Sequence, residues 1–149
     1  MNANRKAFLD MLAVSEGTST SPATLNNGYD VIVTGVDGVP EVFTDYSDHP
    51  FNNGRPSKVI NSHGLTSNAS GRYQFMLRDW HHYRDQLKLP DFSPDSQDLW
   101  ALQLIRERSA LPSKFQDALP MPVVMGIAAV LIVLGVIGRL IEQKPKDPP

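Results

Sequence analysis

Near its start the chain reads Arg5-Lys6-Ala7-Phe8-Leu9-Asp10-Met11-Leu12-Ala13-Val14-Ser15-Glu16-Gly17-Thr18, and this stretch indicates how the fold begins. Its apolar side chains recur at intervals of three and four, the spacing of one face of an α-helix: Ala7, Phe8, Met11 and Leu12. Because Gly17 is a typical helix stop, the pattern predicts a helix that ends at about Glu16, beside a loop.

The position of Glu16 at the end of this helix bears on its chemistry. A carboxylate there meets the negative end of the helix dipole, which disfavours ionisation and keeps a proton on the group near neutral pH. A general acid needs such a proton. The alternative is an ordinary solvated acid beside a glycine, and the local sequence by itself favours that alternative.

The next segments predict a small β-lobe. Residues 18–28 are rich in Ser, Thr, Asn and Pro, while β-branched and aromatic residues fill 29–34 and 39–46. These two stretches bracket Gly35-Val36-Asp37-Gly38, which predicts a β-hairpin. The polar segment 47–70 predicts an irregular region around one short strand at about 58–61. Irregular segments of this length often carry function.

Helical patterning then returns. Residues 72–87 place apolar side chains among charged ones: Phe75, Leu77, Trp80, Tyr83 and Leu87. A further helix is predicted with Ser93 as N-cap and Pro94 in its first turn, running towards Arg108. Its predicted apolar seam is Leu99, Leu102 and Ile105. The order helix, hairpin, helices predicts an α+β fold, in which a small sheet lobe lies beside a helical lobe with a cleft between them.

Composition narrows the function classes. A length of 149 residues suits one domain with a real core. Fourteen basic and sixteen acidic residues give a formal net charge of -2, which argues against a nucleic-acid partner. The chain has no cysteine, so a disulfide framework and a thiolate site are excluded. The first ten residues do not resemble a secretory signal, and nothing in the sequence indicates an oligomeric state.

The segment after Asp117 has a different character. Residues 118–138 carry no charge and, as a helix, would measure roughly 31 Å, close to the ~30 Å hydrocarbon thickness of a bilayer. We therefore predict a domain at 1–117, a transmembrane helix at 118–141 and a polar tail at 142–149. A fully buried core helix is the alternative, although so small a domain would hardly cover it on all sides. Basic residues flank both ends of the segment, so its orientation is left open.

Five collinear motifs give the chain a family resemblance. They are Arg5 to Ala13 with Ser15-Glu16-Gly17-Thr18, Gly28 to Val33, Phe43 to Pro50, Gly71-Arg72-Tyr73-Gln74, and Asp91 to Pro94 with Ser96-Gln97-Asp98. Together they cover about residues 5–112 and resemble the bacteriophage lambda endolysin family. The resemblance places Glu16 on the family's catalytic glutamate. It implies a lysozyme-like fold, needing no cofactor, that cleaves the β-1,4 bond between N-acetylmuramic acid and N-acetylglucosamine in peptidoglycan.

The family resemblance also implies a lytic transglycosylase, which adds no water and forms a 1,6-anhydro sugar. A single carboxyl suffices for that chemistry, and Glu16 would act first as acid and then as base. Ordinary glycosidases need a second carboxylate, for which Asp30, Asp45 and Asp48 are the candidates. We interpret these aspartates as structural or sugar-binding, and expect the last two chiefly to organise the turn before Pro50.

Sugar binding needs aromatic faces and planar amides along a cleft. The candidates are Tyr29, Tyr46, Tyr73 and Gln74, with core packing as the alternative for each tyrosine. Trp80-His81-His82 does not predict a metal site, because adjacent histidines on a helix point in different directions.

The sequence departs from the family pattern after Leu111-Pro112, where the family has further soluble helices and this chain has the apolar segment. Three interpretations follow: a membrane-anchored endolysin, a prophage remnant or fusion with degraded activity, and a non-enzymatic membrane protein that binds peptidoglycan or regulates lysis. For the enzyme, the expected location is the bacterial host cytoplasm or inner membrane, with its peptidoglycan substrate in the periplasm.

Overall fold

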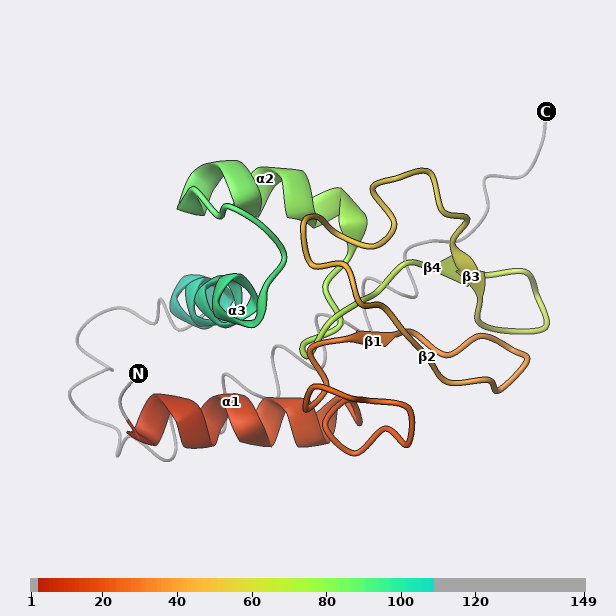
Figure 1. The fold of residues 1–149 in the computed structure, drawn as a ribbon, viewed down its shortest axis with the longest axis horizontal. Helices are drawn as coiled ribbons and strands as arrows, with labels where there is room; N and C mark the ends of the chain where they lie inside the picture. The colour runs from red at the N-terminus through yellow and green to blue at the C-terminus, as the bar shows by residue number, and fades with distance from the viewer. Residues whose placement is uncertain (1–2, 109–149) are drawn as a thin grey trace.

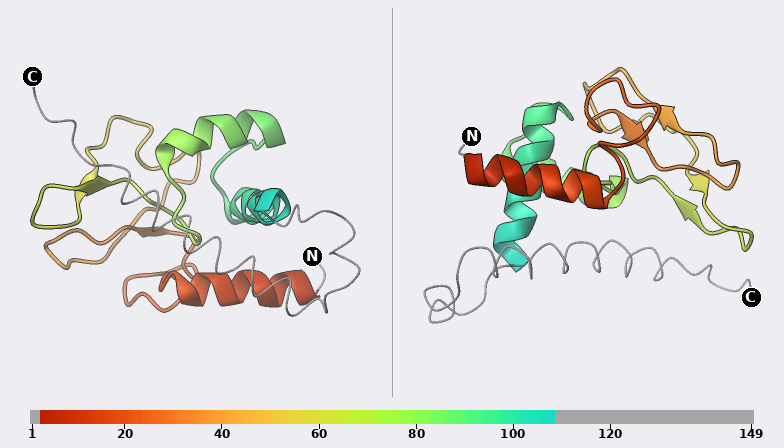
Figure 2. Two further views of the ribbon diagram at one scale, coloured as in Figure 1. Left: turned by 180° about the vertical axis from the view of Figure 1, so that it is seen from behind. Right: turned by 90° about the horizontal axis from the view of Figure 1, so that it is seen from below.

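The computed structural model describes residues 3–108, and its helices and hairpins are grouped separately (Figure 1). Helix α1 (Ala3–Ser15) is followed by two antiparallel hairpins and then by α2 (Leu77–Leu87) and α3 (Pro94–Arg108). Seen from below, α3 runs steeply across α1, and the hairpins lie to one side of the helices (Figure 2). This arrangement confirms the predicted α+β class.

Helix α1 ends where the sequence predicts, one residue before Glu16. The backbone N–H of Glu16 donates to the carbonyl of Leu12 at 2.9 Å, so Glu16 closes the last turn. The buried face differs from the prediction, because Met11 is 42% exposed. The side chains that enter the core are Phe8, Leu9, Leu12 and Ala13. The buried face of α1 is thus rotated slightly from the predicted face. Leu9 and Ala13, which are spaced at i and i+4, complete it.

The predicted hairpin is present, with short strands. Strand β1 (Val31–Ile32) pairs antiparallel with β2 (Glu41–Val42). The expected strand near residue 58 is β3 (Lys58–Val59), and it pairs with β4 (Thr66–Ser67) in a second hairpin that the sequence did not predict. Polar residues fill the segment around β4, which explains why it gave no apolar strand signal.

The predicted helix at 72–87 begins only at Leu77, because the preceding residues form a tight turn. Ser70 and Phe75 exchange both backbone hydrogen bonds, at 2.9 and 2.8 Å. Gln74 has a φ of 51°, which is incompatible with a helix. The prediction was wrong here because amphipathic periodicity continues across a turn that depends on left-handed backbone.

Helix α3 begins at Pro94 as predicted, and the backbone N–H of Gln97 donates to the carbonyl of Ser93 at 2.9 Å. The predicted seam is only partly right, because Leu99 is 55% exposed. Leu102 and Ile105 are partly buried against the core. The buried positions of α3 are instead Ser96, Gln97, Asp98, Trp100, Ala101 and Leu104.

An aromatic cluster joins the helices to the loops between them. The rings of Phe75 and Trp100 are stacked with centroids 3.8 Å apart, and Trp80 meets Phe92 edge-on at 5.1 Å. Aromatic pairs of this kind stabilise the fold beyond the contribution of the apolar area that they bury. His81 and His82, beside Trp80, are exposed. Within the described part of the chain, no group of three potential ligands could hold a metal ion.

His49 is a buried titratable group in the loop after the first hairpin, and is 1% exposed. Its Nε2 lies 3.1 Å from the carbonyl oxygen of Phe75, and the N–H of Phe51 lies 3.3 Å from its Nδ1. These contacts suit a neutral ring that donates from Nε2 and accepts at Nδ1. Burial lowers the pKa of His49 from 6.5 to about 4.

We expect His49 to contribute stability that is lost in acid. Since its folded pKa of about 4 lies below the ordinary 6.5, the unfolded state binds its proton more tightly. The neutral, buried His49 therefore adds about 3 kcal/mol to the free energy of unfolding above pH 6.5, and this contribution is lost as the pH falls towards 4. Urea unfolding of His49→Gln and wild type between pH 8 and 4.5 should therefore show the gap between them closing on acidification. The exposed control His63→Gln should parallel wild type, and a constant gap for His49→Gln would contradict the prediction.

The predicted transmembrane helix and the domain boundaries at residues 117 and 141 lie outside the described residues and stay predictions. Between residues 3 and 108, no helix has both the length and the apolar character needed to cross a membrane.

Candidate active site

A cavity of about 430 Å³ lies where the end of α1 meets the first hairpin. It is lined by Glu16 and the loop that follows it, by β1 with its extension at 33–34, and by Pro40 and Gln74. The predicted cleft between the two lobes therefore has a counterpart, and Glu16 is one of its walls.

The Glu16 carboxyl is partly buried, and its Oε1 atom is fully buried without a hydrogen-bond partner among the described residues. Burial raises the pKa of Glu16 from 4.5 to about 7. The helix dipole is the cause expected from the sequence, whereas the structure assigns the raised pKa to desolvation. A carboxyl with a pKa near 7 can both donate and accept a proton at neutral pH.

The three aspartates considered as second carboxylates do not line this cavity. Asp30 is buried and accepts hydrogen bonds from the Thr24 hydroxyl at 2.5 Å and the Leu25 N–H at 2.7 Å. Its carboxylate therefore holds the loop after α1. Among the cavity-lining residues that the structure describes, Glu16 is the one acid.

Asp45 and Asp48 organise the turn before Pro50, as expected. Asp45 accepts the N–H of Ser47 at 2.8 Å, and this bond lowers its pKa. Asp48 accepts bonds from several segments: from the His49 N–H, the Asn52 amide, the Trp80 indole and the Arg84 guanidinium. Both aspartates line a separate hollow of about 460 Å³, formed by residues between Val42 and Arg55.

Gln74 is the predicted sugar-binding residue that the fold brings to Glu16. The tight turn after β4 places Gln74 in the cavity wall, and its Nε2 donates to the carbonyl of Gly71 at 3.1 Å. Four residues with hydroxyl side chains that were not predicted to bind sugar also line the cavity: Thr18, Thr20, Ser21 and Thr34. The first three lie in the Ser- and Thr-rich loop directly after Glu16, and that composition could have indicated them.

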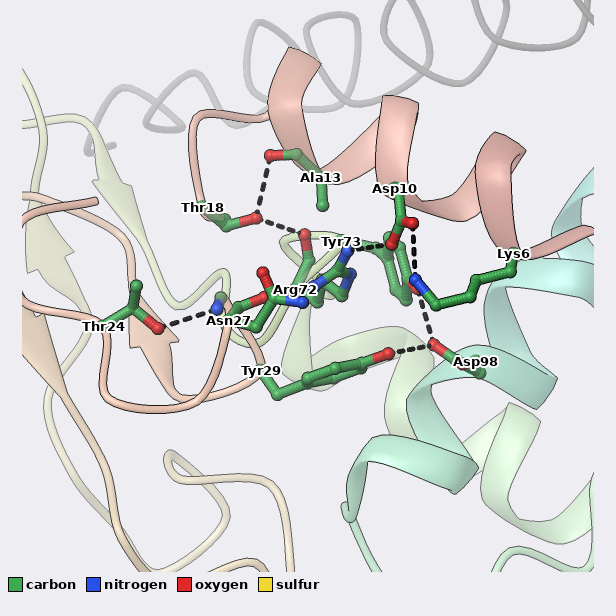
Figure 3. A network of polar contacts seen from close by, with 11 residues as sticks. Lys6, Asp10, Ala13, Thr18, Thr24, Asn27, Tyr29, Arg72, Tyr73 and Asp98 are labelled. Atoms are coloured by element: carbon green, nitrogen blue, oxygen red, sulfur yellow. Dashed lines mark hydrogen bonds and ion pairs between the residues drawn. The ribbon is translucent and has the colours of Figure 1, made fainter. Parts of the chain in front are cut away.

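The three predicted tyrosines do not line the cavity. The hydroxyls of Tyr29 and Tyr73 both donate to Oδ1 of Asp98, at 2.9 and 2.6 Å (Figure 3 shows the first). Burial raises the pKa of Tyr29 to about 12 and that of Tyr73 further still. The hydroxyl of Tyr46 accepts from the Asn26 amide at 2.9 Å. The core-packing interpretation thus fits Tyr73 in particular, which is a buried member of the core.

A family model described as Endolysin matches residues 6–123. The chain belongs to the endolysin family. The resemblance drawn from the five motifs is thereby confirmed, and the match contains both Glu16 and Gln74.

Two phage endolysins are close relatives of this family member. The chain is 69% identical over 108 residues to an endolysin of Escherichia phage P2, covering 72% of this chain and 66% of the relative. It is 56% identical over 113 residues to an endolysin of Escherichia phage lambda, covering 75% of this chain and 65% of the relative. The chain thus spans just under two thirds of the length of either relative.

Solved structures confirm the lysozyme-like fold of this endolysin-family chain. The structure of bacteriophage lambda lysozyme complexed with a chitohexasaccharide matches with a TM-score of 0.62 and 56% identity, covering 75% of this chain and 67% of that one. Another structure, lysozyme from bacteriophage lambda, matches with a TM-score of 0.63 and 42% identity, covering 98% of this chain and 97% of that one.

Proposed function

We propose that the chain cleaves the β-1,4 bond between N-acetylmuramic acid and N-acetylglucosamine as a lytic transglycosylase for host cell lysis, with Glu16 as the acid and base. The observation that carries the proposal is the buried, unpartnered Oε1 of Glu16 in a cavity wall. Membership of the endolysin family supports the reaction class. The chitohexasaccharide bound to lambda lysozyme supports a glycan chain as the ligand.

The proposed reaction needs one carboxyl. Protonated Glu16 donates its proton to the glycosidic oxygen as the C1–O bond breaks, and the N-acetylglucosamine leaves with a free 4-hydroxyl. The Glu16 carboxylate then takes the proton from the C6 hydroxyl of N-acetylmuramic acid as that oxygen bonds to C1. The product is a 1,6-anhydro sugar, no water is consumed, and Glu16 ends protonated again.

The composition of the cavity wall favours this mechanism over hydrolysis. A hydrolase of the usual kind needs a second carboxylate as nucleophile or as base for water. Asp30, Asp45 and Asp48 serve the structure elsewhere, as described above. A pKa of about 7 suits Glu16 to both proton transfers.

Gln74 is the proposed sugar-binding side chain. Its planar amide can donate to and accept from an acetamido or hydroxyl group, and the hydroxyls of Thr20, Ser21 and Thr34 line the same cavity. The tyrosines are left out of the proposed site because they lie outside the cavity wall.

For the location, we propose that residues 118–138 associate with the host inner membrane and that the substrate is the peptidoglycan of the periplasm. The uncharged character of these residues supports that assignment. The inactive remnant and the non-enzymatic binding protein become outcomes of the test that follows.

The full chain incubated with purified peptidoglycan is expected to release muropeptides that end in 1,6-anhydro-N-acetylmuramic acid. These are lighter by one water than hydrolysis products, so mass spectrometry separates the two. The initial rate is expected to fall as the pH rises through about 7, because Glu16 must begin protonated. Hydrated reducing ends would exclude the transglycosylase. Binding without release of any product would favour the non-enzymatic alternative.

A further inference from the structure

We propose that Arg72 is a positioning residue: it holds the turn that carries Gln74 against the end of α1, which carries Glu16. The proposal rests on the proposed function, in which Glu16 and Gln74 act on the same glycan from two walls of one cavity. Arg72 itself is not among the lining residues of that cavity.

The side chain of Arg72 joins separate segments of the fold, although it is only 2% exposed (Figure 3). Its Nη2 lies 2.6 Å from Oδ1 of Asp10, on α1. Its Nη1 donates to the carbonyl of Asn27, in the loop after α1. The guanidinium carbon lies 4.8 Å from the centroid of the Tyr29 ring. The planar fork of an arginine can make these contacts together, which a lysine cannot.

The backbone of Arg72 is fixed at both of its polar groups. Its N–H donates to Oε1 of Gln97, on α3, at 2.8 Å. Its carbonyl accepts the hydroxyl of Thr18 at 2.6 Å, and the N–H of Thr18 donates to the carbonyl of Ala13 at 3.1 Å. Arg72 is therefore connected through one residue to the last turn of α1.

Other hydrogen bonds also hold the turn, but they lead to elements other than α1: the N–H of Gly71 donates to the carbonyl of Val31 on β1 at 2.8 Å, and the hydroxyl of Tyr73 donates to Asp98 on α3 at 2.6 Å. The paired backbone bonds between Ser70 and Phe75 close its base, and Gln74 contacts Gly71 within the turn itself. Neither contact reaches α1. Among the described residues, the hydrogen bonds that tie this turn to Asp10 on α1 and to Thr18 beside its end are therefore those of Arg72.

Asp10→Asn is a mild way to weaken this connection. Asp10 is 43% exposed, and the amide oxygen of asparagine still accepts a hydrogen bond from Arg72 without the opposite charge. We expect kcat to fall about tenfold with KM little changed, because small misplacements of reacting groups cost large factors in rate. The matched control is Lys6→Met, since Lys6 pairs with the other oxygen of Asp10 at 2.6 Å. It should keep the wild-type rate.

A double-mutant cycle separates positioning from general destabilisation. In a Gln74→Ala background, Asp10→Asn is expected to have almost no further effect on kcat, since the positioned group is gone. A purely structural role would lower the rate by the same factor in both backgrounds, in step with the melting temperature. Equal factors in the two backgrounds would overturn the proposal.

A readout without substrate keeps this test independent of the proposed function. The side-chain amide resonances of Gln74 in the full chain should shift in Asp10→Asn and stay in place in Lys6→Met. If the wild-type chain cleaves no peptidoglycan, the proposed function fails while these spectra still decide the role of Arg72. Unchanged Gln74 resonances in Asp10→Asn would overturn it.

Discussion

Glu16→Gln is expected to lower the rate of glycan cleavage about a thousandfold while the chain remains folded. Glutamine has nearly the same shape but cannot donate or recover the proton, and a positioned general acid or base contributes about 10²–10⁴-fold to rate. The assay is anhydromuropeptide release by the full chain at pH 6, below the pKa of about 7 that burial gives Glu16. Cleavage at the wild-type rate would remove Glu16 from the mechanism.

The same substitution is expected to stabilise the protein at alkaline pH. The folded pKa of Glu16, about 7, lies above its ordinary 4.5, so ionisation is harder in the folded state. The loss of stability caused by ionising the buried Glu16 carboxyl is absent below pH 4.5, grows as the pH rises, and is complete above pH 7. After allowance for partial exposure it is about 2 kcal/mol. Urea unfolding should therefore show Glu16→Gln more stable than wild type at pH 8, with the difference vanishing near pH 4.5.

Asp85→Asn provides the control for both measurements. Asp85 is an exposed carboxylate of α2 and does not line the cavity. Its amide variant should match wild type in cleavage rate and in the pH dependence of unfolding. If Glu16→Gln behaved like this control at pH 8, the carboxyl would not be desolvated as described.

Gly71→Ala is expected to destabilise the protein by about 3–5 kcal/mol. A Cβ atom on Gly71 would lie 2.3 Å from Oε1 of Gln97, and the φ of 77° adds strain for any side chain. Gln97 cannot yield cheaply, because it is fully buried and also donates to the carbonyls of Tyr29 and Phe92, at 3.0 and 2.9 Å. Displacing it leaves buried polar groups unpaired, at about 1–3 kcal/mol each.

Gly64→Ala is the matched control for Gly71→Ala. Its φ of 76° is almost the same, but a Cβ atom there would meet nothing within 4 Å. Only the backbone strain remains, so the expected loss is about 1 kcal/mol. Urea unfolding at pH 7 compares the two variants directly. Equal losses would show that the close approach to Gln97 contributes nothing.

Local signals predicted the parts of the fold that depend on neighbours in the chain. A glycine stop located the end of α1, a proline located the start of α3, and Gly35 to Gly38 located the first hairpin. The residue singled out at the helix end, Glu16, does line the cavity. The family motifs added Gln74, whose place in the cavity wall no local pattern indicates.

Contacts between distant segments account for what the sequence did not reveal. The turn before α2 looks helical by periodicity, but its shape depends on Gln97, which lies more than twenty residues later and accepts the N–H of Arg72. Tyr29 and Tyr73 are residues of the type that binds sugar rings, yet both hydroxyls donate hydrogen bonds to Asp98 on α3. Neither the periodicity nor the composition of a segment indicates such distant partners.

The burial of Glu16 and of His49 has a joint consequence for proton exchange during folding. Near pH 5.5 the folding chain takes up a proton at Glu16, whose pKa rises to about 7. It releases a proton from His49, whose pKa falls to about 4. The two transfers are opposite in sign and overlap between about pH 4.5 and 6.5. These two groups therefore buffer the folding equilibrium against mild acid, and replacing either one unmasks the pH dependence due to the other.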